Sequence, residues 1–437
     1  MKPYYIGLAG LLLLTTQSRG QGAGTITAEV DAVYPRSEAL YIDLHRHPEL
    51  SFHEVQTAAK LAAGLRELGY DVSTGIGRTG IVGVLKNGDG PVVMLRTELD
   101  ALPVTEKTGL PYASTVRTED GGVEVGVSHA CGHDIHMAAW MASARIMATT
   151  RTRWRGTLLM IGQPAEELGG GADAMLHDGL FTRFPRPDYA VAVHDDARFP
   201  AGIIGYHAGP ILANVDTVNI TIYGQGGHGA RPETTIDPIV IAARTVLTLQ
   251  TIVSRETSPL DPAVITVGSI HGGSRPNIIP AEVKLELTVR SFTEPVRQHL
   301  LSAIDRVVKA EAAAGGALKE PLIERSDSAY ALVNDPQVTQ RVTAALAREL
   351  DPAKLKDEPP EMGAEDFSEF QHAGVATLML RIGAVQQTTY DAALKSGATL
   401  PSLHSPLFAP DREPTIKAAV AAEVIMLREL MPPQGIS

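Results

Sequence analysis

The chain has 437 residues, of which 44% are hydrophobic and 20% are charged, and its 38 basic and 50 acidic side chains give a formal net charge of −12. This composition is typical of a globular protein of two or three domains, and it excludes a disordered, collagen-like or multi-span membrane protein. The acidic balance argues against nucleic acid or an anionic membrane surface as the main partner, because both select basic patches.

The N-terminus has the pattern of a signal peptide. Lys2 supplies one positive charge, residues 4–14 are apolar, and small and polar residues follow. The apolar stretch is too short to span a bilayer. We therefore predict a signal peptide over residues 1–23, a secreted or periplasmic protein, and no stable membrane insertion once the signal is removed. The alternative is a plain N-terminal helix.

The next part of the chain alternates helical and strand patterns. A helical region runs from about residue 36 to 68, interrupted at Pro48, and Gly69 ends it. Helices such as 135–148 then alternate with short apolar runs, which lie at 81–85, 92–95, 158–161, 189–193 and 377–380. This pattern predicts an α/β domain with a mostly parallel, buried central sheet.

Residues 215–326 have a different pattern. Residues 218–222 and 283–289 alternate apolar and polar side chains strictly, which is typical of a sheet with one buried face and one solvent-exposed face. The predicted order is strand, helix, strand, strand, helix, strand, as in a ferredoxin-like unit. We therefore predict an inserted α+β domain at 215–326, within a discontinuous domain made of residues 24–214 and 327–437. After it, Asp335-Pro336 predicts the start of a helix that runs to Leu350.

Polar side chains follow three of the predicted strands. The strand at 92–95 leads to Asp100, the strand at 158–161 to Glu166-Glu167, and the strand at 189–193 directly to His194. Ligands of open α/β sheets bind beyond the carboxyl ends of the strands. A fourth polar cluster, His129 to His136, opens a predicted helix and can face the same crevice.

Each of these features has an ordinary structural explanation. An acidic pair is usually a solvated turn, a single histidine at a strand end is usually a satisfied polar residue, and a cysteine near a histidine is often a core thiol. The one cysteine, Cys131, excludes an internal disulfide and is a core residue, a reactive thiol or a metal ligand. Thiolate, imidazole and carboxylate groups together favour Zn²⁺ or a similar divalent ion.

The adjacent glutamates suit two different tasks. Neighbouring side chains of an extended loop diverge, so Glu167 can bind metal while Glu166 acts as a general base toward a water molecule. Two metal ions roughly 3.5 to 4 Å apart would share that water, lower its pKa and polarise a scissile carbonyl.

Ordered motifs between residues 36 and 430 resemble a known family. The chain is similar to the aminoacylase and hippurate hydrolase group of dinuclear metallohydrolases, which includes plant hydrolases of indole-acetyl amino acid conjugates and bacterial carboxypeptidase relatives. The motifs that carry the resemblance are Leu44-His45-Arg46-His47-Pro48-Glu49-Leu50, Asp100-Ala101-Leu102-Pro103, His129-Ala130-Cys131-Gly132-His133-Asp134, Glu166-Glu167, Gly226-Gly227-His228-Gly229-Ala230, Gly363-Ala364-Glu365-Asp366-Phe367 and Leu403-His404-Ser405-Pro406.

The resemblance implies a zinc-peptidase-like catalytic domain that holds two divalent ions per subunit, Zn²⁺ or Mn²⁺ or Co²⁺. The implied metal ligands are Cys131, His133, Glu167, His194 and His404. Glu166 would be the general base. Asp100 would orient a metal ligand, and its alternative explanation is a helix or turn cap.

The same resemblance makes the inserted domain a lid and dimerisation module. His228 would stabilise the oxyanion of the tetrahedral intermediate, from its own subunit or from the partner in a homodimer. Asn277 and Arg290 would hold polar groups of the substrate, and an arginine can pair with a free α-carboxylate. Without the resemblance, His228 reads as a turn residue and Arg290 as a surface charge.

Two departures from the family pattern flank the site. Glu98 stands where the family has Asp, and Asp195-Asp196 follow His194 where the family has an apolar residue and a proline. We expect both to affect substrate preference.

The activity that the resemblance implies is cleavage of an N-acyl amino acid, with a small-molecule substrate and no nucleic acid. The alternatives are a dipeptidase or carboxypeptidase of the same family and a non-catalytic extracytoplasmic ligand-binding protein. The presence of Glu166 counts against the last, because a general base has no role in binding alone.

Overall fold

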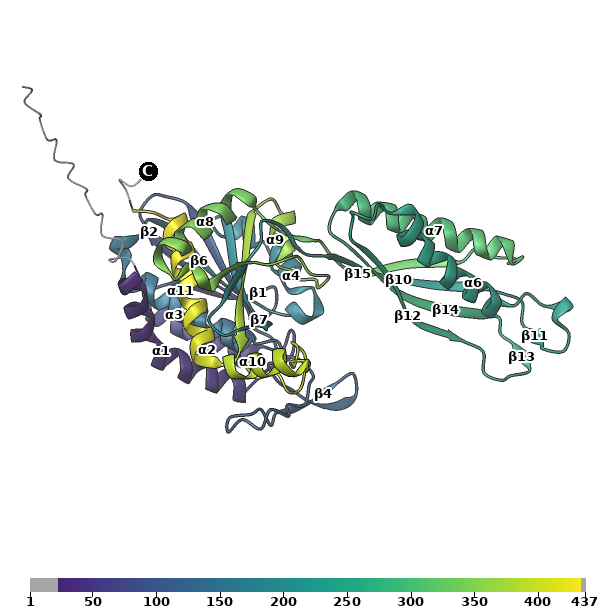
Figure 1. The fold of residues 1–437 in the computed structure, drawn as a ribbon, viewed down its shortest axis with the longest axis horizontal. Helices are drawn as coiled ribbons and strands as arrows, with labels where there is room; N and C mark the ends of the chain where they lie inside the picture. Colours follow the sequence, from purple (N-terminus) through teal and green to yellow (C-terminus); the bar gives the residue numbers. More distant parts are fainter. Residues whose placement is uncertain (1–22, 434–437) are drawn as a thin grey trace, which may run out of the picture.

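The computed structural model describes residues 23–433, which form two bodies joined end to end (Figure 1). The larger is built around an eight-stranded sheet and the smaller around a four-stranded sheet. Apart from Ala23, the predicted signal peptide lies outside the described residues. Within residues 23–433, no helix is long and apolar enough to cross a membrane.

The central sheet of the larger domain is mostly parallel, which confirms the predicted fold class. Its order is β1-β2-β6-β3-β7-β18-β8-β17, and its four middle strands, β6, β3, β7 and β18, run parallel to one another. The strands are β1 Asp71–Ile76, β2 Gly80–Asn87, β3 Val92–Glu98, β6 Gly156–Gln163, β7 Tyr189–Pro200, β8 Ile204–Tyr206, β17 Leu355–Asp357 and β18 Ala376–Val385.

Helices cover both faces of this sheet. Val93 and Leu95 of β3 pack into one hydrophobic cluster and Met94 into another, because successive side chains of a strand point to opposite faces. The first cluster includes residues of α1 Ala23–Arg46, α2 Val55–Glu67, α3 His133–Thr149, α8 Pro336–Glu349 and α11 Arg412–Leu430. The second includes residues of α4 Gly171–His177, α5 Leu180–Arg183 and α9 Ser368–His372.

The first helix is longer than predicted. It begins at Ala23 rather than at about residue 36, because Ile26 and Val30 are buried in the same cluster as the later residues of α1. Pro35 lies inside it. The predicted stop after α2 is confirmed: Gly69 has φ +83°, and the following amide of Tyr70 donates to the Leu65 carbonyl at 3.1 Å.

The smaller domain has the predicted strand and helix order. Its elements are β10 Asn214–Tyr223, α6 Pro238–Thr251, β12 Ala263–Gly272, β14 Glu282–Ser291, α7 Glu294–Ala314 and β15 Leu322–Ala329. The sheet order is β12-β14-β10-β15 with every pair antiparallel. The alternating residues Val218, Ile220 and Ile222 are buried against α6 and α7, so the opposite face of the sheet is left uncovered by these helices.

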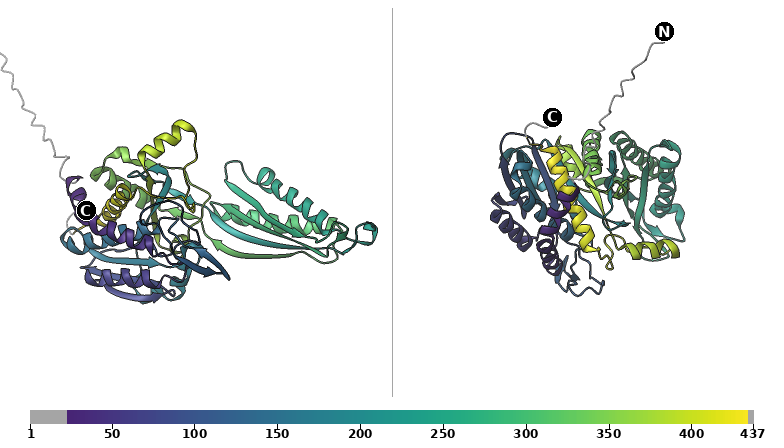
Figure 2. Two further views of the ribbon diagram at one scale, coloured as in Figure 1. Left: turned by 90° about the horizontal axis from the view of Figure 1, so that it is seen from below. Right: turned by 60° about the vertical axis from the view of Figure 1, so that its left-hand side comes forward.

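Short strand pairs complete the fold. β9 Gly209–Leu212 pairs with β16 Leu332–Asn334, so the segments that enter and leave the smaller domain lie side by side. β11 Gly227–His228 pairs with β13 Ile278–Ile279 at the end of the smaller domain that points away from the larger one (Figure 1). The left view of Figure 2 shows the same separation. β4 Arg117–Asp120 pairs with β5 Val123–Gly126, and α10 covers Gln387–Ser396.

Candidate metal centre

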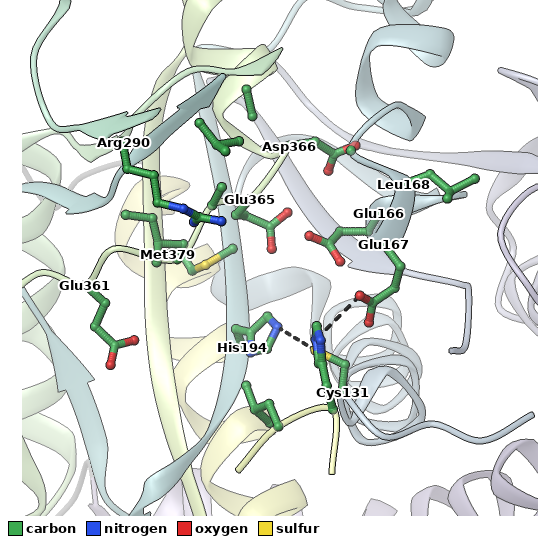
Figure 3. Close-up of a pocket in the computed structure, with 18 of the residues that line it drawn as sticks. Cys131, Glu166, Glu167, Leu168, His194, Arg290, Glu361, Glu365, Asp366 and Met379 are labelled. Atoms are coloured by element: carbon green, nitrogen blue, oxygen red, sulfur yellow. Dashed lines mark hydrogen bonds and ion pairs between the residues drawn. The ribbon is translucent and has the colours of Figure 1, made fainter. Parts of the chain in front are cut away.

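A cavity of about 550 Å³ lies where the two domains meet, and we call it the metal pocket. Figure 3 shows its side chains. Residues of both domains line it, among them Cys131, Glu166, Glu167, His194, Glu365 and His404 from the larger domain and Thr288 and Arg290 from the smaller one. All five predicted metal ligands lie in or beside this pocket.

His194 is placed differently from the sequence prediction. It does not follow the end of a strand but lies inside β7, which continues to Pro200. The neighbouring strand β3 pairs with β7 only from Val93 to Arg96, opposite Tyr189 to Ala192. His194 therefore lies beyond the last β3 pairing, and the crevice opens there.

A glycine positions Cys131 and His133. Gly132 has φ +77°, and a Cβ atom on it would lie 2.0 Å from a carboxylate oxygen of Asp195. The turn that presents Cys131 and starts α3 at His133 can therefore approach β7 only without a side chain at this position.

The side chains of the ligands converge. The Cys131 Sγ atom lies 3.7 Å from Nε2 of His194 and 3.3 Å from Nε2 of His404. Glu167 extends the cluster, with one carboxylate oxygen 3.5 Å from Nε2 of His404 and the other 3.8 Å from Nε2 of His133. Figure 3 shows Cys131, Glu167 and His194 directed toward one another.

This arrangement fits a divalent metal ion. Nε2 of His133 and Oε1 of Glu167 are buried and have no hydrogen-bond partner among the described residues. Burial raises the pKa of the Cys131 thiol, and the nearby Glu167 carboxylate raises it further. Burial lowers the pKa of His194, which favours the neutral imidazole that binds metals. A bound cation would satisfy the unpaired atoms and favour the thiolate.

Hydrogen bonds orient two of the imidazoles. Nδ1 of His133 donates to the backbone carbonyl of Asp100 at 2.8 Å, and Nδ1 of His194 donates to the carbonyl of Asp195 at 2.8 Å. Both Nε2 atoms therefore point into the pocket as potential ligands. The Asp100 carboxylate accepts from the backbone amide of Glu167 at 3.1 Å and from Ser51 at 2.6 Å, so Asp100 contacts the segments of two predicted ligands.

Glu166 points in a different direction from Glu167 (Figure 3). It follows Ala165, whose φ of +48° is a left-handed conformation that non-glycine residues rarely adopt. The Glu166 carboxylate lies 3.8 Å from Nε2 of His133. Burial raises its pKa well above the usual range, and the charges of Glu365 and Glu167 raise it further. It therefore holds a proton more readily than an exposed glutamate does.

Local sequence patterns did not identify the acidic partners of Glu166. Its carboxylate forms a close group with Glu365 and Asp366, and the fully buried Arg96 contacts both of them, at 2.6 and 3.1 Å. The sequence analysis did single out the Gly363-to-Phe367 motif, which contains Glu365 and Asp366. The motif is far from Glu166 in sequence, so no local pattern predicted that these side chains lie beside Glu166.

The first departure, Glu98, has specific partners. It forms an ion pair with Arg96 and accepts a hydrogen bond from Nδ1 of His136 at 2.9 Å. Nε2 of His136 accepts from the backbone amide of Asp195 at 2.8 Å. Glu98 therefore supports the backbone beside His194 through His136. Glu98 and His136 also form a second close group with His133 and His194.

His404 reaches the cluster from a surface loop. Its side chain is 56% exposed and its φ is +65°. Its backbone amide donates to the carbonyl of Ala130 at 2.7 Å, which ties the loop to the segment that carries Cys131. No spacing rule relates these two segments, and only the family resemblance identified His404.

The predicted residues of the smaller domain are divided between two places. Arg290 lines the metal pocket, where its guanidinium donates to the backbone carbonyl of Met362 at 2.5 Å. His228 and Asn277 are exposed and lie near each other around β11 and β13, at the end away from the pocket (Figure 1). A single chain does not bring them to the metal ligands.

Comparisons with known proteins place the chain in one peptidase family. A model described as "Peptidase family M20/M25/M40" matches residues 94–394. Thermostable carboxypeptidase 1 of Saccharolobus solfataricus is 36% identical over 75% of this chain and 80% of its own. N-acetyl-L-cysteine deacetylase of Bacillus subtilis is 36% identical over 74% of this chain and 75% of its own. Hippurate hydrolase of Campylobacter jejuni is 35% identical over 76% of this chain and 84% of its own.

A solved structure extends the similarity to the whole fold. A dinuclear metal binding peptidase of the M20 family from Bacillus subtilis superposes with a TM-score of 0.74 at 29% identity, covering 91% of this chain and 98% of that one.

Proposed function

Because the chain belongs to the peptidase family M20/M25/M40, we propose that it is a metal-dependent amidohydrolase that cleaves N-acyl amino acids into an acid and an amino acid. Enzymes of this family hydrolyse amide or peptide bonds, and the substrate class is the part that we propose. The observation that carries it is one pocket that holds a metal-type ligand cluster, a protonatable glutamate and a guanidinium group.

Cys131, His133, Glu167, His194 and His404 would hold two divalent ions, Zn²⁺ or Mn²⁺ or Co²⁺. When bound, the ions would lower the pKa of a water molecule and polarise the scissile carbonyl. Asp100 would keep His133 and the Glu167 backbone in position through the contacts described above.

Glu166 would take the proton of the attacking water and deliver it to the leaving amine. Its direction away from Glu167 and its raised pKa support this role, because the group must both accept and release a proton. Arg96 would offset the negative charge of Glu365 and Asp366 beside Glu166, since it pairs with both.

Arg290 would bind the α-carboxylate of the substrate. Among the residues whose side chains the structure describes, no carboxylate lies within 4.0 Å of its guanidinium, although the group lines the metal pocket. It can therefore form a bidentate pair with a substrate carboxylate without breaking an existing ion pair.

His228 would stabilise the oxyanion from the partner subunit of a homodimer, with Asn277 beside it contacting the substrate. Their exposure and their distance from the pocket of their own chain support an action in trans. The Nδ1 atom of His228 accepts from the amide of Ala230 at 3.0 Å, which leaves Nε2 as the donor.

We also propose that the protein is secreted or periplasmic, on the basis of the apolar stretch at residues 4–14. N-terminal sequencing of the mature protein exported by a bacterial host tests this, and retention of Met1 would contradict it.

One specific observation favours a second candidate function. A carboxypeptidase is among the relatives, and a carboxypeptidase also needs a cation for the substrate α-carboxylate. The two functions differ in whether the substrate has a free α-amine.

A substrate panel separates them. The purified protein, loaded in turn with Zn²⁺, Mn²⁺ and Co²⁺, is assayed for amine release from acetyl, benzoyl and indole-acetyl amino acids and from dipeptides. We expect faster release from the acylated substrates. Preference for dipeptides would support the carboxypeptidase, and no release from any substrate would contradict the proposed function.

A further inference from the structure

A second cavity, of about 680 Å³, adjoins the metal pocket, and we call it the side pocket. The two cavities share three lining residues, Glu361, Arg381 and Leu403. Leu403 immediately precedes the predicted metal ligand His404, and Arg381 lies opposite His194 in the pairing of β18 with β7. The side pocket therefore begins beside the metal ligands.

The charged residues of the side pocket neutralise one another. Arg198 pairs with Asp196 at 2.6 Å and also contacts Glu361. Arg381 lies 3.5 Å from Asp196 and 3.3 Å from Glu361. Two cations and two anions thus form one network with no net formal charge, although Nη2 of Arg381 makes no hydrogen bond within it. A substrate carboxylate would have to compete with these ion pairs in the side pocket. At Arg290 it would meet a guanidinium that forms no ion pair with the described side chains.

The rest of the side pocket is mostly apolar. Its lining includes Ala197, Tyr390, Ala393, Leu394 and Leu400. Several of them belong to α10. The structure describes every residue of this helix, and none of these residues is buried. Leu394 is 68% exposed. An apolar group in the side pocket would therefore remove apolar surface of α10 from water, which favours its binding.

We propose that the side pocket binds the acyl group of the substrate and selects large apolar acyl groups, such as aryl-acyl or medium-chain alkyl-acyl, over acetyl. The proposal rests on the proposed function. Arg290 does not line the side pocket, so the α-carboxylate and the acyl group are held in different places with the scissile amide between them. The relatives do not decide acyl size, since a deacetylase and a hippurate hydrolase are both among them.

The first test compares acyl groups on one amino acid. The metal-loaded protein is assayed with N-acetyl, N-octanoyl and N-benzoyl derivatives of the same amino acid. Each buried methylene contributes up to about fourfold in kcat/KM. We expect kcat/KM to be at least tenfold higher for the octanoyl and benzoyl substrates. Equal values, or a preference for acetyl, would overturn the proposal.

The second test fills the side pocket. Ala393→Trp places a bulky side chain on the face of α10 that lines it, and Ala392→Trp makes the same change at an exposed position that does not line it. We expect Ala393→Trp to lower the octanoyl-to-acetyl ratio of kcat/KM by tenfold or more and Ala392→Trp to leave it unchanged. Ala398→Trp fills the same pocket from the following loop and covers the case in which Ala393→Trp does not fold. A ratio unchanged in every folded pocket variant would contradict the proposal.

A binding measurement separates this proposal from the proposed function. An N-octyl amino acid, with CH₂ in place of the carbonyl, cannot be hydrolysed, and its affinity is measured by calorimetry against the N-ethyl analogue. We expect at least tenfold tighter binding of the N-octyl compound, lost in Ala393→Trp but not in Ala392→Trp. Absence of hydrolysis with this preference intact would contradict only the proposed reaction. Absence of the preference would contradict the side pocket assignment even in an active enzyme.

Discussion

The two domains place their predicted functional residues in opposite ways. In the larger domain, Cys131, Glu167, His194 and His404 come from distant segments and meet within a few ångströms. In the smaller domain, the predicted residues lie in two places, with Arg290 in the metal pocket and His228 at the far end of the sheet (Figure 1).

The difference follows from sheet architecture. Parallel strands end at the same edge, so loops that are far apart in sequence meet there. An antiparallel sheet distributes its turns between both ends, and here one end contacts the larger domain while the other projects into solvent. The loops of the larger domain therefore gather the predicted ligands within one chain, while the residues at the far end of the smaller domain lie away from them.

We expect the largest effect from a change at Glu166. It tests whether proton transfer and metal binding in the larger domain depend on different residues. Glu166→Gln removes the proposed base without removing a predicted ligand, so kcat falls by about 10³-fold. Metal content measured by elemental analysis stays at the wild-type value. Loss of activity and metal together would show that Glu166 is a ligand and that the base is misassigned.

The next prediction tests whether His228 of the smaller domain acts at the metal pocket of a partner subunit. His228→Ala lowers kcat by about 10²-fold, because one oxyanion donor is lost. His271→Ala, also exposed in the smaller domain, is the matched control and keeps wild-type kcat.

Subunit mixing then tests action in trans. When His228→Ala and Glu166→Gln subunits are refolded or exchanged together, a mixed dimer has one site with both residues intact. Because half of the dimers are mixed and each has one complete site, activity should return to roughly a quarter of wild type. Activity that stays at the level of the separate variants would contradict action from the partner.

A smaller effect concerns the thiol of the larger domain. Cys131→Ser removes the soft ligand, so metal affinity falls by roughly 10²-fold, as titration with a competing chelator would measure. Activity should return at high metal concentration. Unchanged metal affinity would make Cys131 a core residue.

A change at Arg290, the predicted residue of the smaller domain that lines the metal pocket, tests whether its guanidinium binds the substrate α-carboxylate. Arg290→Ala raises KM about tenfold for substrates with a free α-carboxylate and changes it little for the matching carboxamides, because the lost pairing is specific to the anion. Arg325→Ala, which breaks an exposed ion pair with Asp305 in the same domain, is the control. An equal rise for both substrate types would contradict the assignment.

The last prediction concerns stability rather than activity, at a buried carboxyl group outside the metal pocket. Burial raises the pKa of Glu423 from 4.5 to about 8, although a hydrogen bond from Ser143 at 2.6 Å opposes the shift. The folded protein therefore binds this proton more tightly than the unfolded chain, and the group's contribution to stability is full below pH 4.5 and lost as pH rises to about 8.

Glu423→Gln removes this dependence. The free energy of unfolding of the wild type should fall relative to the variant by about 1 kcal/mol per pH unit across this window. Urea unfolding at pH 5 and pH 8 measures it, with Glu413→Gln, at an exposed position of α11, as the control. Parallel pH profiles for wild type and Glu423→Gln would contradict the assignment.

Much of the fold was predictable because its signals are local. The strand at 92–95 is a short apolar run, and Asp335-Pro336 caps α8 through hydrogen bonds from the backbone amides of residues 337 and 338 to the Asp335 side chain. The alternation at 218–222 marks the buried and exposed faces of β10. Each signal depends on residues within a few positions, so the printed sequence contains it completely.

The tertiary structure decided what depends on distant contacts. The length of α1 depends on Ile26 packing into the core, and the partners of Glu98 and Glu166, namely His136, Glu365 and Asp366, depend on how the sheet stacks. The sequence by itself determined the fold class and the order of the main strands and helices of the smaller domain. Only the folded chain determined that Glu166 lies among acidic groups and that His228 lies far from its own metal pocket. Local backbone preferences act over a few residues, whereas these distances result from the packing of two whole domains.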